Sequence, residues 1–252
     1  MPEYERKVVL PSQGLLYDKL PGGEVQIRAM TTQEEKILAS PTSDRAGNTL
    51  LDRLFKRCTD LPKDFPPAKL LTIDRFSLLL HLRAVSYGPK YQVSYNCVQC
   101  RKLNYVNVDL EEDVLAEEVK LEEAPPEEGF EVVLPKLGKT IGWRYTTGED
   151  EAAADKQRSK LRGNESSVIE FRLARQIATI DGLPVENFVD LLNMVRKLSV
   201  MDNIALRDSM KEHEFGVTSL EFDFDCDSCG TQQPPMTMPV SKDFFRVVSP
   251  GD

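Results

Sequence analysis

The spacing of apolar residues changes within the first half of the chain, from one typical of helices to one typical of strands. From residue 31 to 88 the apolar positions recur every three or four residues, which is typical of helices with one buried face. This spacing predicts three helices, over about 33–39, 49–58 and 73–87. Thr31 with Glu34, or Thr32 with Glu35, fits a capping box before the first helix, and Thr72 is a candidate cap for the last.

The period then changes to two, as in half-buried strands. Apolar residues alternate in KYQVSYNC, which ends at Cys97, and again in NYVNVDL after Cys100, so the first Cys-x-x-Cys pair is placed at the tip of a hairpin. LEFDFDC alternates in the same way up to Cys226, and a shorter extended run, MTMPV, follows Cys229. Both segments therefore predict a strand, a CxxC turn and a returning strand.

A long stretch separates the two cysteine pairs. It opens with an acidic run that contains prolines, EEDVLAEEVKLEEAPPEEG, which is expected to be exposed. A hairpin from FEVVLP to IGWRYT follows, and then come helical stretches over about 149–162 with 165–180, 184–198 and 199–213. Ser199 with Asp202 fits a cap for the last of these helices.

These elements predict an α+β fold. In it, a small antiparallel β module, a split zinc ribbon, carries an inserted helical lobe and an N-terminal strand and helix region. The expected parts are 1–90 for the N-terminal strand and helix region, 91–110 with 217–247 for the split zinc-ribbon module, 111–148 for the acidic linker and hairpin, and 149–216 for the helical insertion. Because the hairpins of a ribbon must pair, residues near Asp109 and Thr218 are expected to lie close together.

Four of the five cysteines stand in the two pairs, Cys97 with Cys100 and Cys226 with Cys229. A Cys-x-x-Cys turn aims both sulfurs at one point, so two pairs predict one tetrahedral zinc ion, Zn²⁺. All four ligands then come from the protein and leave no open position for a reacting water, so the zinc is predicted to be structural. A redox dithiol and an iron–sulfur cluster are the alternatives. The fifth cysteine, Cys58, is expected in the core.

Composition and charge narrow the class of protein. The 252 residues carry a net charge of −9, so no overall basic field would attract a nucleic-acid backbone. The first residues, MPEYERKVVL, have charges where a signal peptide needs an apolar core, and no apolar run approaches the ~20 residues of a membrane span. The sequence therefore predicts a cytosolic protein, in which thiols stay reduced and cysteine pairs favour metal over disulfides.

Patterns of catalytic residues are not found in the sequence. His81 and His213 fall in predicted helices, and neither accompanies a serine or cysteine nucleophile motif. The carboxylates fall in runs that are typical of solvated surface, and the glycines do not form a phosphate-binding loop. The protein is therefore predicted not to be an enzyme, with no catalytic or cofactor-binding residues, no small-molecule substrate and no membrane partner.

Contacts with other proteins are expected on two parts of the chain, the helical lobe and the N-terminal strand region. The N-terminal segment KVVLPSQGLLY is more apolar than a chain end requires. Large exposed apolar patches usually mark interaction sites, although these residues could equally cover the core of the protein itself. Leu15 and Leu16 are the positions at which these two alternatives can be separated.

Three stretches together resemble one family, the baseplate hub subunits of T-even phages. They are LPSQGLLY with VQIRAMTTQEEKIL near the start, IDRFSLLLHLRAVSYGPKYQVSYNCVQC in the middle, and MDNIALRDSMKEHEFG before the CDSC pair. The resemblance covers most of the chain and is weakest in the acidic linker and the helical insert. It implies a non-enzymatic tail protein of a contractile-tailed phage, whose partners are other tail proteins.

The resemblance leaves two roles open. The protein would be either a lasting structural or assembly component of the baseplate hub, or a cytosolic assembly chaperone for the tail tape-measure protein that is absent from mature particles. Both place it in the host bacterial cytoplasm during assembly, and the first also places it in the virion tail. A zinc-ribbon nucleic-acid adaptor is a distant alternative, which the net charge of −9 disfavours.

Overall fold

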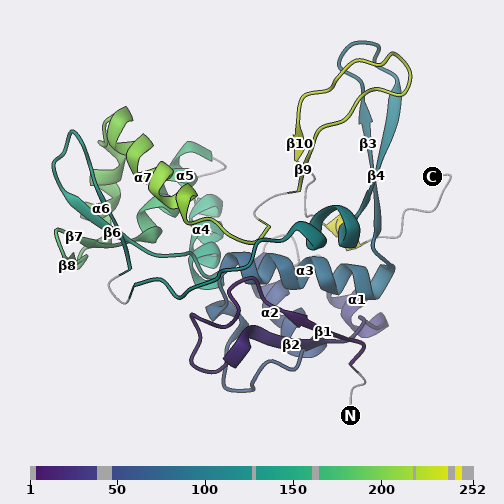
Figure 1. Cartoon of the computed structure of the whole chain (residues 1–252), viewed down its shortest axis with the longest axis horizontal. Helices are drawn as coiled ribbons and strands as arrows, with labels where there is room; N and C mark the ends of the chain where they lie inside the picture. Colours follow the sequence, from purple (N-terminus) through teal and green to yellow (C-terminus); the bar gives the residue numbers. More distant parts are fainter. Residues whose placement is uncertain are drawn as a thin grey trace.

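The computed structural model describes residues 4–38, 47–126, 129–160, 165–217, 220–237 and 242–245 (Figure 1). The structure combines helices with small antiparallel sheets, which confirms the predicted α+β class. A long helix, α3 (Thr72–Tyr87), runs through the middle of the view. The helices within residues 148–212 lie to one side of it, and an arm formed by two hairpins rises from the other.

The N-terminal part of the chain builds one hydrophobic core around α3. The strands β1 (Arg6–Val9) and β2 (Glu24–Ile27) form an antiparallel hairpin, and the helices α1 (Thr32–Leu38) and α2 (Gly47–Cys58) follow. Side chains from all of these elements are buried together; the most enclosed include Ile27, Leu54, Phe55, Leu78, Leu80 and Leu82. Leu-rich α3 contributes to this core along much of its length, which explains the strength of its helical pattern in the sequence.

The apolar N-terminal segment is divided between the core and the surface. Val8 and Leu10 are buried in the core, whereas Val9 is 40% exposed and Leu15 is 42% exposed. Part of the apolar character of this segment therefore covers the protein's own interior, and Val9 and Leu15 are left at the surface.

Local capping at the first helix follows the sequence prediction. The backbone N–H of Thr31 donates to Glu34 Oε2 at 2.9 Å, which is the capping box expected from Thr31 and Glu34. Burial raises the pKa of Glu34, but hydrogen bonds from Arg28, Thr31 and Arg57 outweigh it and hold the pKa well below its ordinary value. The buried Glu34 thus ties α1 to α2 through Arg57.

The prediction that Thr72 caps α3 is wrong. Leu71 occupies the capping position, and no side chain accepts a hydrogen bond from the first turn. The backbone N–H of Thr72 instead donates to the carbonyl oxygen of Thr146 at 2.9 Å. The start of α3 is therefore satisfied by a segment that follows more than 70 residues later, which no local signal at Thr72 could reveal.

A second hydrophobic core lies in the helical lobe. Four antiparallel strands form a sheet in the order β5 (Phe130–Val133), β6 (Thr140–Trp143), β7 (Ile177–Ile180) and β8 (Leu183–Pro184). Helices α5 (Glu165–Gln176), α6 (Phe188–Arg196) and α7 (Val200–Glu212) contribute to the same core, and α4 (Gly148–Lys160) packs beside α5. The enclosed side chains include Leu134, Ile141, Trp143, Leu173, Leu191 and Leu206.

One predicted helix is too long. The stretch expected to be helical over 165–180 ends at Gln176, and Ile177–Ile180 forms β7 along the edge of β6. Ile177 enters the core as a strand residue. The sheet thereby joins the hairpin of the linker region to the helical insertion, although the sequence analysis placed them in separate parts of the chain. The division of the chain into four parts stays a prediction.

The beginning of the acidic linker is not exposed as expected. A short π-helical turn, Leu110–Val114, is capped by the Asp109 carboxylate and lies against α3. Leu110 and Val114 are both buried in the first core. These two apolar residues, spaced four apart among acidic neighbours, hold the start of the linker on the body of the protein.

Two hairpins form the arm that carries the cysteines. β3 (Lys90–Asn96) and β4 (Leu103–Asp109) pair along their full length, from Lys90 opposite Asp109 to Asn96 opposite Leu103. The second hairpin pairs only β9 (Glu221–Phe222) with β10 (Met236–Thr237), and it runs alongside the first (Figure 1). Thr218 and residues 238–241 lie outside the described residues, so the expected approach of Asp109 and Thr218 stays a prediction.

Candidate metal centre

The two cysteine pairs meet at the tips of the two hairpins. All four Sγ atoms, from Cys97, Cys100, Cys226 and Cys229, lie within 4.8 Å of one another. Cys97 Sγ is 3.7 Å from Cys229 Sγ, and Cys100 Sγ is 3.7 Å from Cys226 Sγ. These contacts join residues that are 132 and 126 positions apart in the chain. The long insertion therefore leaves this site and returns to it.

The same backbone turn presents the sulfurs in both hairpins. In the first, Cys97 N–H donates to the Lys102 carbonyl and Arg101 N–H donates to the Cys97 carbonyl, both at 3.0 Å. In the second, Cys226 N–H donates to the Thr231 carbonyl at 3.0 Å and Gly230 N–H to the Cys226 carbonyl at 2.8 Å.

The residue after each pair must adopt a left-handed conformation to close this turn. Its φ is 58° at Arg101 and 68° at Gly230. Glycine adopts this conformation without strain, whereas Arg101 has a Cβ that disfavours it by about 1 kcal/mol. The first turn is therefore held against a small backbone cost by the contacts around it.

Backbone amides around Cys97 favour its thiolate form. The N–H groups of Cys100 and Gln99 both point at Cys97 Sγ, each at 3.4 Å. These hydrogen bonds, that from Cys100 first, outweigh burial and lower the pKa of the Cys97 thiol to about 6. A thiolate is the form that binds metal, so the turn prepares this sulfur as a ligand.

The four sulfurs fit a tetrahedral metal ion. Zinc lies about 2.3 Å from a cysteine sulfur, and a regular tetrahedron of that size separates its sulfurs by about 3.8 Å. The two shortest sulfur separations, 3.7 Å each, agree with this spacing. Cys97 and Cys226 are buried and Cys229 is exposed, so the cluster lies at the surface of the arm with its sulfurs turned inward. Such a donor set binds a thiophilic metal and leaves no ligand position for a substrate.

A side chain that the sequence analysis did not single out links the two hairpins. Gln233 is 4% exposed, and its amide nitrogen lies 3.4 Å from Cys97 Sγ. Its amide oxygen accepts a hydrogen bond of 3.0 Å from the backbone N–H of Val98. Gln233 follows the second pair in sequence and supports the first pair in space. A single polar residue after a turn gives no signal of this role.

Other contacts between the hairpins do not involve sulfur. The rings of Tyr95 and Phe224 lie 4.3 Å apart, and the Tyr95 hydroxyl donates to the Asp225 carbonyl at 3.3 Å. The Thr231 hydroxyl donates to Gln99 Oε1 at 2.7 Å. The two hairpins therefore contact each other along the arm as well as at the cysteine cluster.

The remaining residues considered from the sequence lie away from the cluster. Cys58 is fully buried in the first core, as expected, and burial raises the pKa of its thiol to about 11. His81 is in α3, and the ring of His213 lies 4.2 Å from that of Phe130. In the described part of the chain, every helix is too short or too polar to cross a bilayer.

Two hairpins with four clustered cysteines form an arm beside the two hydrophobic cores, and this cluster is compatible with a metal site. Comparison with known families assigns the chain more closely. The family described as "T4 bacteriophage base plate protein" matches residues 1–246, so the chain belongs to that family of phage baseplate proteins. Neither the curated proteins nor the solved structures contain a significant match to the chain.

Membership in this family supports the coarser functional expectations. The protein is a baseplate component of a T4-type phage tail, and its partners are other proteins of that tail. A family of structural baseplate proteins also suggests a role without catalysis.

Proposed function

We propose that the protein is a non-enzymatic structural or assembly component of the baseplate hub of a contractile phage tail. The family match, which spans residues 1–246, carries this proposal. Two further features support it. The cysteine cluster offers no open coordination position, and the separate cores and projecting arm provide several distinct surfaces for contacts with neighbouring tail proteins.

We also propose that Cys97, Cys100, Cys226 and Cys229 bind one structural zinc ion. The sulfur spacing supports this, as do the amides around Cys97. When bound, zinc would tie the two hairpins together, and the binding energy would contribute on the order of 10 kcal/mol to folding. Elemental analysis of the purified protein tests the proposal: about one zinc per chain is expected, and a metal-free protein with intact thiols would overturn it.

We infer that the arm, the N-terminal region and the helical insertion act as separate modules. The two hydrophobic cores support this division, one around α3 and one in the lobe of α5 to α7. The hairpin of β5 and β6 belongs with the insertion in this proposal, because it shares a sheet with β7 and β8. Limited proteolysis, which should cut first between these modules, tests the division.

A second role, an assembly chaperone for the tape-measure protein, is favoured by the acidic character of the chain and by its exposed apolar residues on the lobe. Val200 is 76% exposed and Leu183 is 71% exposed. In both roles the protein would meet its partners in the host bacterial cytoplasm during assembly. The net charge of −9 continues to disfavour the nucleic-acid adaptor.

Mass spectrometry of purified virions separates the two roles. A hub component should be present at a fixed copy number relative to other baseplate proteins, whereas a chaperone should be absent from virions and present in infected cells. Deletion of the gene is expected to give defective tails in both cases. This experiment therefore serves as a control, because it shows whether the protein is required for tail assembly.

A further inference from the structure

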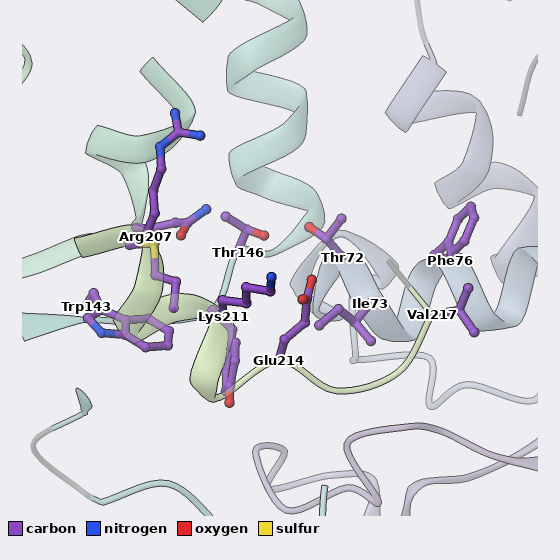
Figure 2. Close-up of a pocket in the computed structure, with 12 residues that line it drawn as sticks. Thr72, Ile73, Phe76, Trp143, Thr146, Arg207, Lys211, Glu214 and Val217 are labelled. Atoms are coloured by element: carbon purple, nitrogen blue, oxygen red, sulfur yellow. The ribbon is translucent and has the colours of Figure 1, made fainter. Parts of the chain in front are cut away.

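A pocket lies where the first core meets the helical lobe. Figure 2 shows it between the start of α3, the residues that follow β6, and the C-terminal end of α7. Its volume is about 510 Å³, within the range of roughly 300–1,000 Å³ that is usual for ligand sites. The apolar part of its lining comes from both sides of this junction: Ile73, Phe76, Trp143, Tyr145, Met210 and Val217. A cleft between two cores is a common place for a binding site.

The rim of the pocket carries two positive charges. Arg207 and Lys211 stand four residues apart on α7, and both are exposed. Among the described residues, neither forms an ion pair; Arg207 donates only to the amide oxygen of Asn203. Glu214 is the one acidic residue of the lining, so two cations and one anion leave a net charge of +1 at the pocket. This local charge is opposite in sign to the net charge of the chain, −9.

One residue of the pocket wall also carries a buried polar group. The hydroxyl of Thr72, one of the lining residues, is inaccessible to solvent and has no hydrogen-bond partner in the described part of the chain. Buried polar atoms are normally paired, so one without a partner calls for an explanation, of which a bound water or another bound group is one. In Figure 2, Thr72 and Thr146 stand side by side on the wall opposite the end of α7.

We propose that this pocket binds a short peptide segment of another tail protein, in which an acidic residue stands next to an aromatic or aliphatic residue. The apolar side chain would enter between Trp143 and Phe76, and the carboxylate would face Arg207 and Lys211. This proposal rests on the proposed function in one respect only, namely that the peptide belongs to another tail protein. The chemistry of the peptide follows from the apolar lining and the unpaired cations, since opposite charges on a rim steer and orient a partner.

The single tryptophan of the chain makes the pocket directly measurable. Trp143 lies in its wall and is the single tryptophan, so binding of a tryptophan-free peptide in the pocket is expected to change the emission. Surface-displayed random short peptides should first be selected on the purified full-length protein. Enriched sequences are expected to carry Asp or Glu within two positions of Leu, Phe, Tyr or Trp, and synthesised peptides without Trp should shift the emission of Trp143 on titration.

Charge variants then test the recognition. R207E with K211E should weaken the selected peptides by about tenfold or more, because charge-assisted hydrogen bonds are lost and replaced by repulsion. E214Q should tighten binding, because it removes the one acid on the rim. The matched control is R53E with K56E, which makes the same change in net charge on exposed residues near the end of α2. This control should bind like the wild type.

Several results would overturn the proposal. They are the absence of any enriched peptide, enrichment without acidic residues, or equal binding by the wild type and the R207E with K211E variant. If that variant does not fold, as judged by circular dichroism, the milder R207Q with K211Q replaces it. Peptide binding that is weakened by R207E with K211E reports on the pocket, whereas virion composition reports on the proposed function, so failure of one is distinguishable from failure of the other.

Discussion

Gln233 and Cys97 are in contact across 136 positions of sequence, with the glutamine amide nitrogen 3.4 Å from the cysteine sulfur. The same amide accepts from Val98 N–H, so one side chain from the second hairpin holds the turn of the first. Because its nitrogen faces a sulfur whose thiolate form the local amides favour, Gln233 would stabilise negative charge on Cys97 while it joins the hairpins.

Gln233→Ala should therefore destabilise the arm. The loss leaves Val98 N–H without its acceptor in a partly buried position, which costs about 1–3 kcal/mol. Chemical unfolding of the zinc-loaded protein measures this change, and the metal should also be released faster to a chelator. Gln232→Ala is the matched control, because Gln232 is exposed and should show no change in either measurement. Equal behaviour of the two variants would contradict the role of Gln233.

Removal of a single cluster cysteine should abolish metal binding. Cys97→Ser or Cys229→Ser leaves three thiols, and each variant is expected to lose its zinc and unfold at a markedly lower temperature, since the binding energy of a structural zinc is folding energy. Cys58→Ser is the control within the same chain. Cys58 lies in the first core, so its variant should keep the full zinc content. Zinc retained by the Cys97 and Cys229 variants would refute the four-thiolate site.

The stability of the first core should depend on pH through His81. Burial, with Arg6 and Lys120 nearby, lowers the pKa of His81 from 6.5 to about 4. The unfolded chain therefore binds a proton below about pH 6.5 that the folded chain does not take up until about pH 4. The free energy of unfolding should fall through this window, by at most about 1.4 kcal/mol per pH unit from this group.

His81→Gln should reduce that pH dependence. Urea unfolding at pH 7 and at pH 4.5 measures it, and the wild type should lose more stability between the two than the variant. Acid release of metal from the cysteine cluster affects both proteins alike, so it cancels in the comparison. The same loss of stability in both proteins would show that His81 does not titrate as described.

The pairing of β6 with β7 can be tested at Gly142. A Cβ at this position would lie 2.0 Å from Thr179 Oγ1, far inside contact distance. Gly142→Ala should destabilise the lobe by about 1–3 kcal/mol through overpacking. Adding Thr179→Ala removes the clashing hydroxyl and should recover part of the loss, as measured by thermal unfolding. The absence of any recovery would count against the register in which Gly142 faces Thr179.

Much of the local structure was determined by the sequence. The Thr31–Glu34 and Ser199–Asp202 caps depend on residues three apart, and both form as predicted. The long helix α3 and the hairpin of β3 with β4 follow directly from their apolar periods. The two Cys-x-x-Cys turns were also evident, because the turn and the strands around it are encoded within a dozen residues.

Only the tertiary structure decided which of these parts meet. Ile177–Ile180 is apolar enough for either a helix or a strand, and it became β7 because the free edge of β6 offers backbone hydrogen bonds there. Thr72 lost its expected capping role because the Thr146 carbonyl satisfies the start of α3 from another part of the chain. Gln233 reaches Cys97 for the same kind of reason. Periodicity and capping report on neighbours within a few residues, whereas these contacts depend on how distant segments pack.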